Sequence, residues 1–237
     1  MTPVRKYAPT SRNLSADIKQ ILLDRGLRSG DPLPSESELI ELLAVSRGTL
    51  REALKGLQAL EIIETRHGTG SFVGKLSLRA MTDGLTFHSQ LGQGQDDLST
   101  AADLTDIREI LETALIQRVA EEVSEAKLAK LHGLAQQLGD AAAGGFGAEF
   151  HRADRQFHRA LYDDIGNALV LQLLDGFWHT LDSVRDSLPA PFDMPEDAAR
   201  KHHAILIALR KHDPESAQEA MRDHFALTRP WILVGRK

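Results

Sequence analysis

Four polar side chains that could bind a metal ion fall on the apolar faces of three predicted helices. Asp154 and His158 lie four residues apart in one helix, and His202 and His224 lie in the last two helices, in step with leucine, isoleucine and phenylalanine residues. A buried carboxylate or imidazole without a partner is costly. One divalent metal ion would satisfy all four groups, so the spacing indicates a site with three histidines and one carboxylate.

Spacing alone gives equal weight to two interpretations, a metal site and ordinary hydrogen-bonded histidines. Nitrogen and oxygen ligands of this kind suit Zn²⁺, Ni²⁺, Mn²⁺ or Fe²⁺, and the sequence does not choose among them. His203 is interpreted as an outward-facing or supporting residue, and His151 and His179 as weaker candidates for the pocket.

Arg108 stands where an apolar residue is expected. It shares one helical stripe with Leu104, Leu111 and Leu115, so its guanidinium must be paired inside the protein. One alternative is a structural salt bridge to Glu112 or to a residue of another helix. The other is a carboxylate ligand that Arg108 holds with two parallel hydrogen bonds.

A second set of residues predicts contact with DNA. Ser35 and Glu38 have the capping-box spacing that begins a helix, which ends at Ala44 and Val45. Ser46 then caps a second helix, which has one apolar face. A different face of that helix is basic and carries Arg47, Arg51 and Lys55. The alternative interpretation of this basic face is a row of solvated charges on an ordinary surface helix.

A predicted β-hairpin follows these two helices without a long loop. Residues 62–65 and 71–73 read as strands, and Arg66, His67 and Gly68 lie at the tip between them. Glycines at the tip permit a tight turn that exposes backbone amides. Two short helices followed by a hairpin indicate a winged helix-turn-helix, whose second helix enters the major groove of double-stranded DNA.

Composition and charge limit the possible functions. The chain has 237 residues and a net charge of −6, with no cysteine, which excludes disulfides and thiol catalysis. The acidic balance disfavours a non-specific DNA-binding structural protein, because such proteins are broadly basic. Without a signal peptide or an apolar stretch long enough to span a membrane, we expect a cytoplasmic protein.

The expected fold is mainly α, with an N-terminal winged helix-turn-helix followed by an all-α antiparallel helical bundle. The expected divisions are a flexible arm at 1–13, the DNA-binding domain at 14–75, a linker with a helix at 76–100, and an effector-binding and dimerisation domain at 101–237. The linker helix is expected at 76–91, before a break at 92–95. The later helices are expected near 103–122, 125–141, 147–164, 167–188, 195–211 and 215–233.

The segment from Asp17 to Val73 resembles the GntR superfamily of bacterial transcription regulators, through the phrases LPSESEL, VSRGTLREAL and HGTGSFV. The resemblance implies that Arg47 and Arg51 read bases and phosphates and that the wing delivers His67 and Gly68. It also implies backbone contacts from the first turn of the recognition helix, made by Ser46 and Thr49. The chain departs from the common pattern of that family at Ser37, Ala44 and Glu61, where arginine, glycine and glycine are frequent.

Residues 104–230 resemble the FCD ligand-binding domain of the FadR branch. The resemblance rests on the segments 108–112, 154–158, 202–206 and 221–224, with Leu161 and Asn167. It implies that a metal is held by Asp154, His158, His202 and His224. It also favours a small organic acid as the ligand of Arg108.

The sequence therefore predicts a homodimeric transcription factor that binds a palindromic operator under the control of a small carboxylate. The effector would bind the metal and Arg108, shift the packing of the bundle and act on the DNA-binding heads through the linker helix. Two other classes remain as alternatives. One is a metal-dependent enzyme with a DNA-binding domain, and the other is a non-specific DNA-binding structural protein.

Overall fold

The computed structural model describes residues 14–75, 77–91, 95–184 and 194–226, and the chain is mainly helical with one small sheet. It divides into two compact units, Met1–Ala80 and Met81–Lys237. This confirms the predicted fold class of a winged helix-turn-helix followed by an all-α bundle. The predicted arm at 1–13 lies outside the described residues. No helix within the described ranges is long and apolar enough to cross a membrane.

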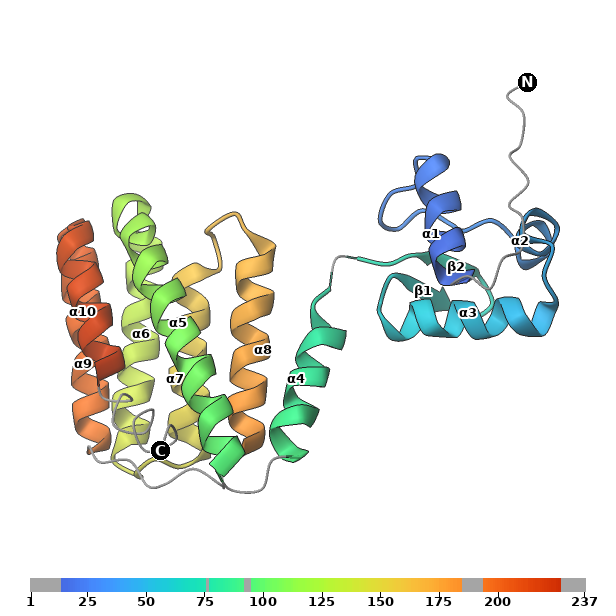
Figure 1. The fold of residues 1–237 in the computed structure, drawn as a ribbon. Coiled ribbons are helices and arrows are strands. Elements are labelled where there is room, and N and C mark those ends of the chain that lie inside the picture. Colours follow the sequence, from blue (N-terminus) through green and yellow to red (C-terminus); the bar gives the residue numbers. More distant parts are fainter. Residues whose placement is uncertain (1–13, 76, 92–94, 185–193, 227–237) are drawn as a thin grey trace. The chain divides into compact units, whose positions relative to one another are not determined.

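The N-terminal unit packs three helices against a hairpin (Figure 1). The predicted apolar face of the recognition helix is confirmed, because Leu50 and Leu57 are fully buried and Ala53 and Leu54 pack against them. The elements are α1 (Leu14–Asp24), α2 (Glu36–Leu43), α3 (Arg47–Ala59), β1 (Ile63–Arg66) and β2 (Gly70–Val73).

The predicted capping box at the start of α2 is half formed. The Ser35 hydroxyl accepts a hydrogen bond from the Glu38 amide over 3.2 Å, as expected. The Glu38 carboxylate does not return to the amide of Ser35 within the described residues. It accepts a hydrogen bond from Arg25 over 2.7 Å instead. An arginine brought close by the tertiary fold therefore replaces the local partner that the sequence suggested.

Two of the residues that depart from the family pattern have a left-handed backbone. Ala44, which ends α2, has a φ of 54°, and Glu61, between α3 and β1, also has a φ of 54°. This conformation is strained for residues with a Cβ atom and is readily adopted by glycine. Glycine would adopt these two turns without the strain that a Cβ atom brings at Ala44 and Glu61.

The wing is an antiparallel hairpin whose register runs from Ile63 opposite Val73 to Arg66 opposite Gly70. The segment that precedes α2 lies beside β2. The Leu33 amide donates to the Ser71 carbonyl over 2.8 Å, and Pro32 forms a bridge with Phe72. The base of the wing is therefore tied to the same chain that leads into the helix-turn-helix.

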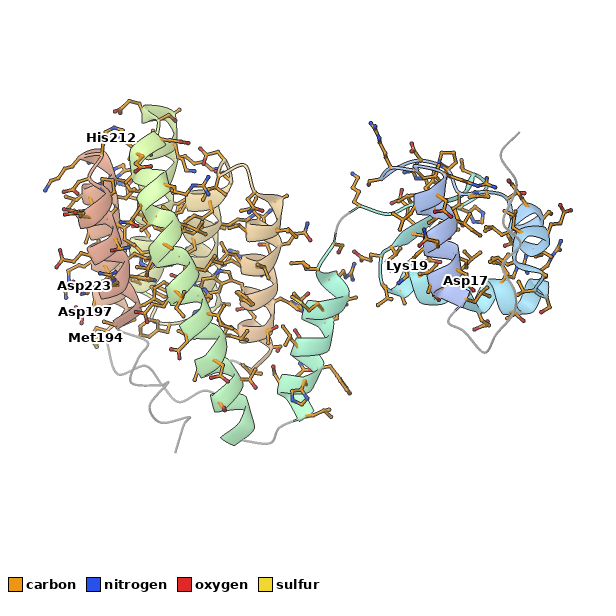
Figure 2. The ribbon with its side chains drawn as sticks, turned by 45° about the horizontal axis from the view of Figure 1, so that its top comes forward. Asp17, Lys19, Met194, Asp197, His212 and Asp223 are labelled. Atoms are coloured by element: carbon orange, nitrogen blue, oxygen red, sulfur yellow. The ribbon has the colours of Figure 1, made fainter. Side chains whose placement is uncertain are left out.

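The C-terminal unit is a bundle in which α10 packs on α5 and α9, and α6 packs on α7 and α9 (Figure 1). Figure 2 shows His212, in the turn between α9 and α10, at one end of the bundle and Met194, before α9, at the other. The elements are α4 (Arg79–Leu91), α5 (Gln95–Glu122), α6 (Glu125–Ala142), α7 (Ala148–Tyr162), α8 (Ala168–Val184), α9 (Pro195–Arg210) and α10 (Pro214–Ala226).

The predicted helices of the bundle are found with shifted ends. The largest shift is in α5, which begins at Gln95 rather than near 103, so the helix extends into the expected linker. The expected ends of α8 at 188 and of α10 at 233, and most of the expected break at 92–95, lie outside the described residues. Sequence periodicity located the helices well because each has a continuous buried stripe, whereas the polar first turns of α5 gave no such signal.

The helix α4 packs on α8 through small hydroxyl side chains. Thr86 and Thr180 share a hydrogen bond of 2.9 Å in the interior. A Cβ atom at Gly176 would collide with the methyl group of Thr82, so glycine is required for this close approach. The large side chain of Phe87 is 62% exposed. The amphipathic pattern of α4 is therefore the reverse of the usual one, with polar groups facing the bundle.

Replacing Ala44 with glycine should stabilise the N-terminal unit. The change relieves the left-handed strain, and we expect a gain of about 1 kcal/mol in the free energy of unfolding. Hydrogen exchange of the amides in α2 and α3 would measure it. The matched control, Ala53→Gly inside α3, should instead lose about 1 kcal/mol. A loss in Ala44→Gly as large as in the control would show that the positive φ carries no strain.

Candidate functional site

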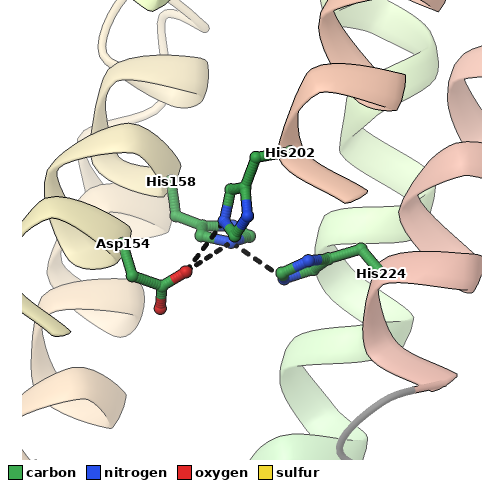
Figure 3. A group of neighbouring side chains, drawn as sticks. All are labelled: Asp154, His158, His202 and His224. Atoms are coloured by element: carbon green, nitrogen blue, oxygen red, sulfur yellow. Dashed lines mark hydrogen bonds and ion pairs between the residues drawn. The ribbon is translucent and has the colours of Figure 1, made fainter. Parts of the chain in front are cut away.

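The four predicted metal ligands lie together inside the C-terminal bundle (Figure 3). Asp154 and His158 come from α7, His202 comes from α9 and His224 comes from α10. One ligand atom from each residue lies within 4.8 Å of the corresponding atoms of the other three. His158 and His202 are fully buried, and His224 is 9% exposed. Three helices therefore direct the metal-binding groups of these residues to one point.

Hydrogen bonds on the outer side of two rings orient them toward this point. The Nδ1 atom of His158 lies 2.5 Å from a carboxylate oxygen of Glu112, and Nδ1 of His202 lies 2.8 Å from the carbonyl oxygen of Ala198. Because both partners are acceptors, each Nδ1 carries the proton and donates it. The Nε2 atom of each ring is then left with a lone pair that faces the cluster.

The inward-facing nitrogen atoms of the cluster lie close to one another and to the Asp154 carboxylate. Nε2 of His158 and Nε2 of His224 are 3.1 Å apart. Nε2 of His202 is 2.8 Å from a carboxylate oxygen of Asp154, but the angle does not suit a hydrogen bond. Two ligands each about 2.1 Å from one ion would lie about 3–3.5 Å apart. The donor set therefore suits a divalent cation, and these two separations are close to those of ligands on one ion.

The electrostatics of the cluster favour the protonation states that bind metals. Burial on its own would raise the pKa of Asp154, but the contact with His202 and the nearby His158 and His224 together lower it well below its usual range. Burial, with further contributions from His202 and His158, lowers the pKa of His224 well below the usual value for histidine. An ionised carboxylate beside a neutral imidazole is the form that a metal ion requires.

Arg108 forms the salt bridge that was one of its two predicted alternatives. It is 5% exposed. Its Nε atom donates to Glu112 over 3.0 Å, and a terminal nitrogen lies 2.9 Å from the same oxygen. Its guanidinium lies 3.9 Å from the centre of the Trp178 ring. The terminal nitrogen that lies 2.9 Å from Glu112, Nη2, forms an ion pair without the geometry of a hydrogen bond, and the Trp178 indole nitrogen has no hydrogen-bond partner in the described part of the chain. Binding of an effector by Arg108 stays a prediction.

Glu112 contacts a metal-ligand candidate as well as Arg108, its predicted partner. Its side chain is fully buried and contacts both Arg108 and His158. Burial would raise the pKa of Glu112, but its contacts with His158 and Arg108 outweigh the effect of burial and lower the pKa. The available signal was a glutamate four residues after a buried arginine. Nothing local in the sequence indicated the contact with His158, 46 positions away.

The three histidines of uncertain role lie outside the cluster. His203 is half-buried and contacts the ring of His132, and His151 packs against Phe146 and Phe150. His179 is exposed. Neighbouring positions on α9 thus differ sharply, with His202 in the cluster and His203 outside it.

The predicted DNA-contacting residues of α3 lie on an exposed surface. Ser46 caps the helix by accepting from the Thr49 amide over 3.1 Å, and the two hydroxyls are 2.8 Å apart. Arg47 is exposed and forms no ion pair with the residues that the structure describes. Arg51 pairs with Glu36 over 3.2 Å, and its side chain remains 58% exposed. Exposed pairs contribute about 0–1 kcal/mol, so a phosphate could displace this one.

The remaining predicted contacts lie on the same helix and on the wing. Lys55 is exposed and pairs with Glu52 over 2.8 Å. Arg66 pairs with Glu64, and its guanidinium lies 4.0 Å from the centre of the Phe72 ring. His67 and Gly68 are exposed at the tip, where Gly68 has a φ of 72°. Their contacts with DNA stay predictions.

Family models match both units of the chain. Residues 10–73 match the family described as bacterial regulatory proteins, gntR family. Residues 103–227 match the family described as FCD domain. The matches cover the helix-turn-helix with its wing and the bundle that contains the histidine cluster.

Individual relatives match nearly the whole length of the chain. A protein of Bacillus subtilis strain 168 named "Uncharacterized HTH-type transcriptional regulator YcbG" is 31% identical over 92% of this chain and 88% of its own length. The "HTH-type transcriptional repressor NanR" of Escherichia coli K12 is 29% identical over 95% of this chain and 86% of its own. Among solved structures, "Streptococcus agalactiae GntR" has a TM-score of 0.63 at 27% identity, covering 92% of this chain and 97% of that one.

Substitution of His202 should abolish stoichiometric metal binding. The protein with Zn²⁺ or Ni²⁺ should retain one ion per chain after removal of excess metal, and His202→Ala should retain none, because it loses a buried ligand. Elemental analysis measures the ratio. The adjacent variant His203→Ala is the matched control and should behave as the unsubstituted protein. Retention of one ion per chain by His202→Ala would place the site elsewhere.

Proposed function

Since this chain belongs to the gntR family of bacterial regulatory proteins and carries an FCD domain, we propose that it binds a palindromic operator as a homodimer and responds to a small carboxylate held at a metal site. The chain is a transcription regulator. The predicted alternative of a metal-dependent enzyme with a DNA-binding domain is set aside, because the family consists of regulators. What we propose beyond the family is the metal, the effector class and the dimer.

The observation that carries this proposal is the cluster of Asp154, His158, His202 and His224, with buried Arg108 joined to His158 through Glu112. Evolution of a stable core alone would favour apolar residues at these positions, since buried charges are expensive. A metal ion at the cluster would supply a Lewis-acid position for an anionic oxygen, and the donors of Arg108 suit a carboxylate. Zn²⁺, Ni²⁺, Mn²⁺ and Fe²⁺ all suit the ligand set.

We assign DNA binding to residues 14–75, with α3 as the recognition helix. Ser46, Arg47, Thr49, Arg51 and Lys55 would contact DNA from α3, and Arg66, His67 and Gly68 from the wing. One such helix reads few base pairs, and two related by a two-fold axis read half-sites about one helical turn apart. This geometry is the argument for a homodimer and a palindrome.

We assign residues 101–237 to effector binding and dimerisation. We assign to the linker helix the transmission of the effector's influence to the DNA-binding domain. The helix α4 packs on α8 through Thr86 and Thr180. A ligand that repacks the bundle would change this contact only if it binds the two arrangements with different affinities. The effector would thereby change the positions of the two DNA-binding heads and the affinity for the operator.

Removing either arginine of the recognition helix should weaken operator binding. We expect Arg47→Ala and Arg51→Ala to reduce affinity about tenfold or more, since each contact with a base contributes about 1–3 kcal/mol. Fluorescence anisotropy with an operator selected from random duplexes would measure this.

The control for these variants is Arg152→Ala, which removes an exposed arginine from the C-terminal unit. It should leave operator affinity unchanged. Unaltered affinity and sequence preference in Arg47→Ala and Arg51→Ala would remove α3 from the interface. Equal affinity of the unsubstituted protein for operator and scrambled duplex would support the non-specific structural alternative.

Carboxylic acids should raise the melting temperature of the metal-loaded protein. A ligand at one hundred times its dissociation constant stabilises the native state by about 2.7 kcal/mol. We expect Arg108→Lys to lose most of this response, because lysine keeps the charge but not the paired donors. Arg118→Lys, on the exposed surface of the same helix, is the control. An identical response in Arg108→Lys would remove Arg108 from the effector site.

A further inference from the structure

We propose that Glu112 is a positioning residue that couples Arg108 to the histidine cluster. Binding of a metal ion at the cluster would then change the affinity of Arg108 for an anion, and binding of an anion would change the affinity of the cluster for the metal. This inference rests on the proposed function, because it concerns how the metal and the carboxylate influence each other. It assigns a role in regulation to a residue that neither binds DNA nor belongs to the group of four metal ligands.

The two carboxylate oxygens of Glu112 serve different partners. Oε1 accepts from Nε of Arg108 over 3.0 Å, and Oε2 accepts from Nδ1 of His158 over 2.5 Å. The glutamate side chain is fully buried. Its backbone is also held, since the Tyr162 hydroxyl donates to the Glu112 carbonyl over 3.2 Å. One carboxylate in a fixed position therefore joins an arginine of α5 to a histidine of α7.

Glu112 lies on the opposite side of the His158 ring from the cluster. It contacts Nδ1, whereas Nε2 approaches His224 at 3.1 Å and Asp154 at 3.8 Å. Glu112 is therefore a partner of a ligand rather than a ligand itself. A carboxylate in this place fixes the ring orientation and the protonated nitrogen, and it increases the basicity of the nitrogen that binds metal.

Because Arg108 and His158 share the Glu112 carboxylate, binding at one of them affects binding at the other. A cation on Nε2 of His158 would polarise the Nδ1–H group and strengthen its hydrogen bond to Glu112. An anion that binds Arg108 would compete with Oε1 for the guanidinium and leave more negative charge for His158. Each event favours the other, and a coupling of this kind is equal in both directions.

A simpler role would be neutralisation of buried Arg108 alone. In that case the loss of Glu112 would reduce the stability of the protein and would leave unchanged both the metal affinity and the choice of ring nitrogen that carries the proton in neutral His158. Glutamine separates the two roles because it has nearly the same shape, but only one of its terminal atoms accepts hydrogen bonds. Arg108 and His158 approach different oxygens of the carboxylate, so the amide oxygen can take the place of only one of them.

The first test measures the affinity of the metal alone. Competition with a chromophoric chelator should show Zn²⁺ bound about 10–100-fold more weakly by Glu112→Gln. Glu121→Gln, on the exposed surface of the same helix, is the matched control and should match the unsubstituted protein. Unchanged affinity in Glu112→Gln refutes the coupling role but leaves the proposed function intact. Absence of metal binding by the unsubstituted protein refutes the proposed function itself.

The second test asks whether Arg108 acts through Glu112. The change in Zn²⁺ affinity caused by Arg108→Met should be larger in the protein with Glu112 than in the Glu112→Gln protein, which is the signature of coupled residues. Equal changes in the two backgrounds would show that Arg108 acts only by its charge and would overturn the proposal.

A third measurement needs no variant and applies if Glu112→Gln fails to fold. Nitrogen-15 NMR of the metal-free, unsubstituted protein with labelled histidine should place the proton of neutral His158 on Nδ1, toward Glu112. A neutral ring protonated on Nε2 would mean that Glu112 does not set the protonation of His158 and would overturn the proposal.

Discussion

Burial of ionisable groups is the constraint on which the C-terminal bundle depends. Arg108, Glu112, His158 and His202 are within a few per cent of complete burial, and Asp154 and His224 lie beside them. Each would be costly in an apolar interior without a partner. Within the cluster, hydrogen bonds satisfy the outer side of the rings of His158 and His202. The inner side is left with lone pairs that suit a cation.

This arrangement makes the packing of several helices depend on one polar network. Asp154 and His158 belong to α7, while Glu112 and Arg108 belong to α5, which α10 also contacts. A change in the charge or position of any one of these side chains alters the electrostatic energy of the others, because electrostatic interactions are strong where water is absent. An apolar core of equal size would pack these helices without this dependence on the charges of individual side chains.

The sequence predicted most of the fold because local signals agreed with the final packing. Ser46 caps α3, apolar periodicity located the bundle helices, and glycines marked the wing. Where the predictions failed, the cause was a contact between residues that are distant in the sequence. Arg25, distant in sequence, takes the Glu38 carboxylate. The spacing also found all four residues of the cluster, but not the contact of Glu112 with His158, since no helical period relates positions on different helices.

The contact between α4 and α8 is lined by hydroxyl groups, and it determines how strongly α4 packs on the bundle. Thr82, Thr86 and Ser89 are buried there, while Phe87 and Leu91 face outward. Hydrophobic stabilisation increases with the apolar area removed from water, and threonine and serine side chains bury little apolar area. Detaching or sliding α4 would therefore cost less hydrophobic free energy than it would for a helix that packs through leucine side chains. The contact between α4 and α8 can therefore rearrange at a small cost in free energy, and the packing of the rest of the bundle need not change with it.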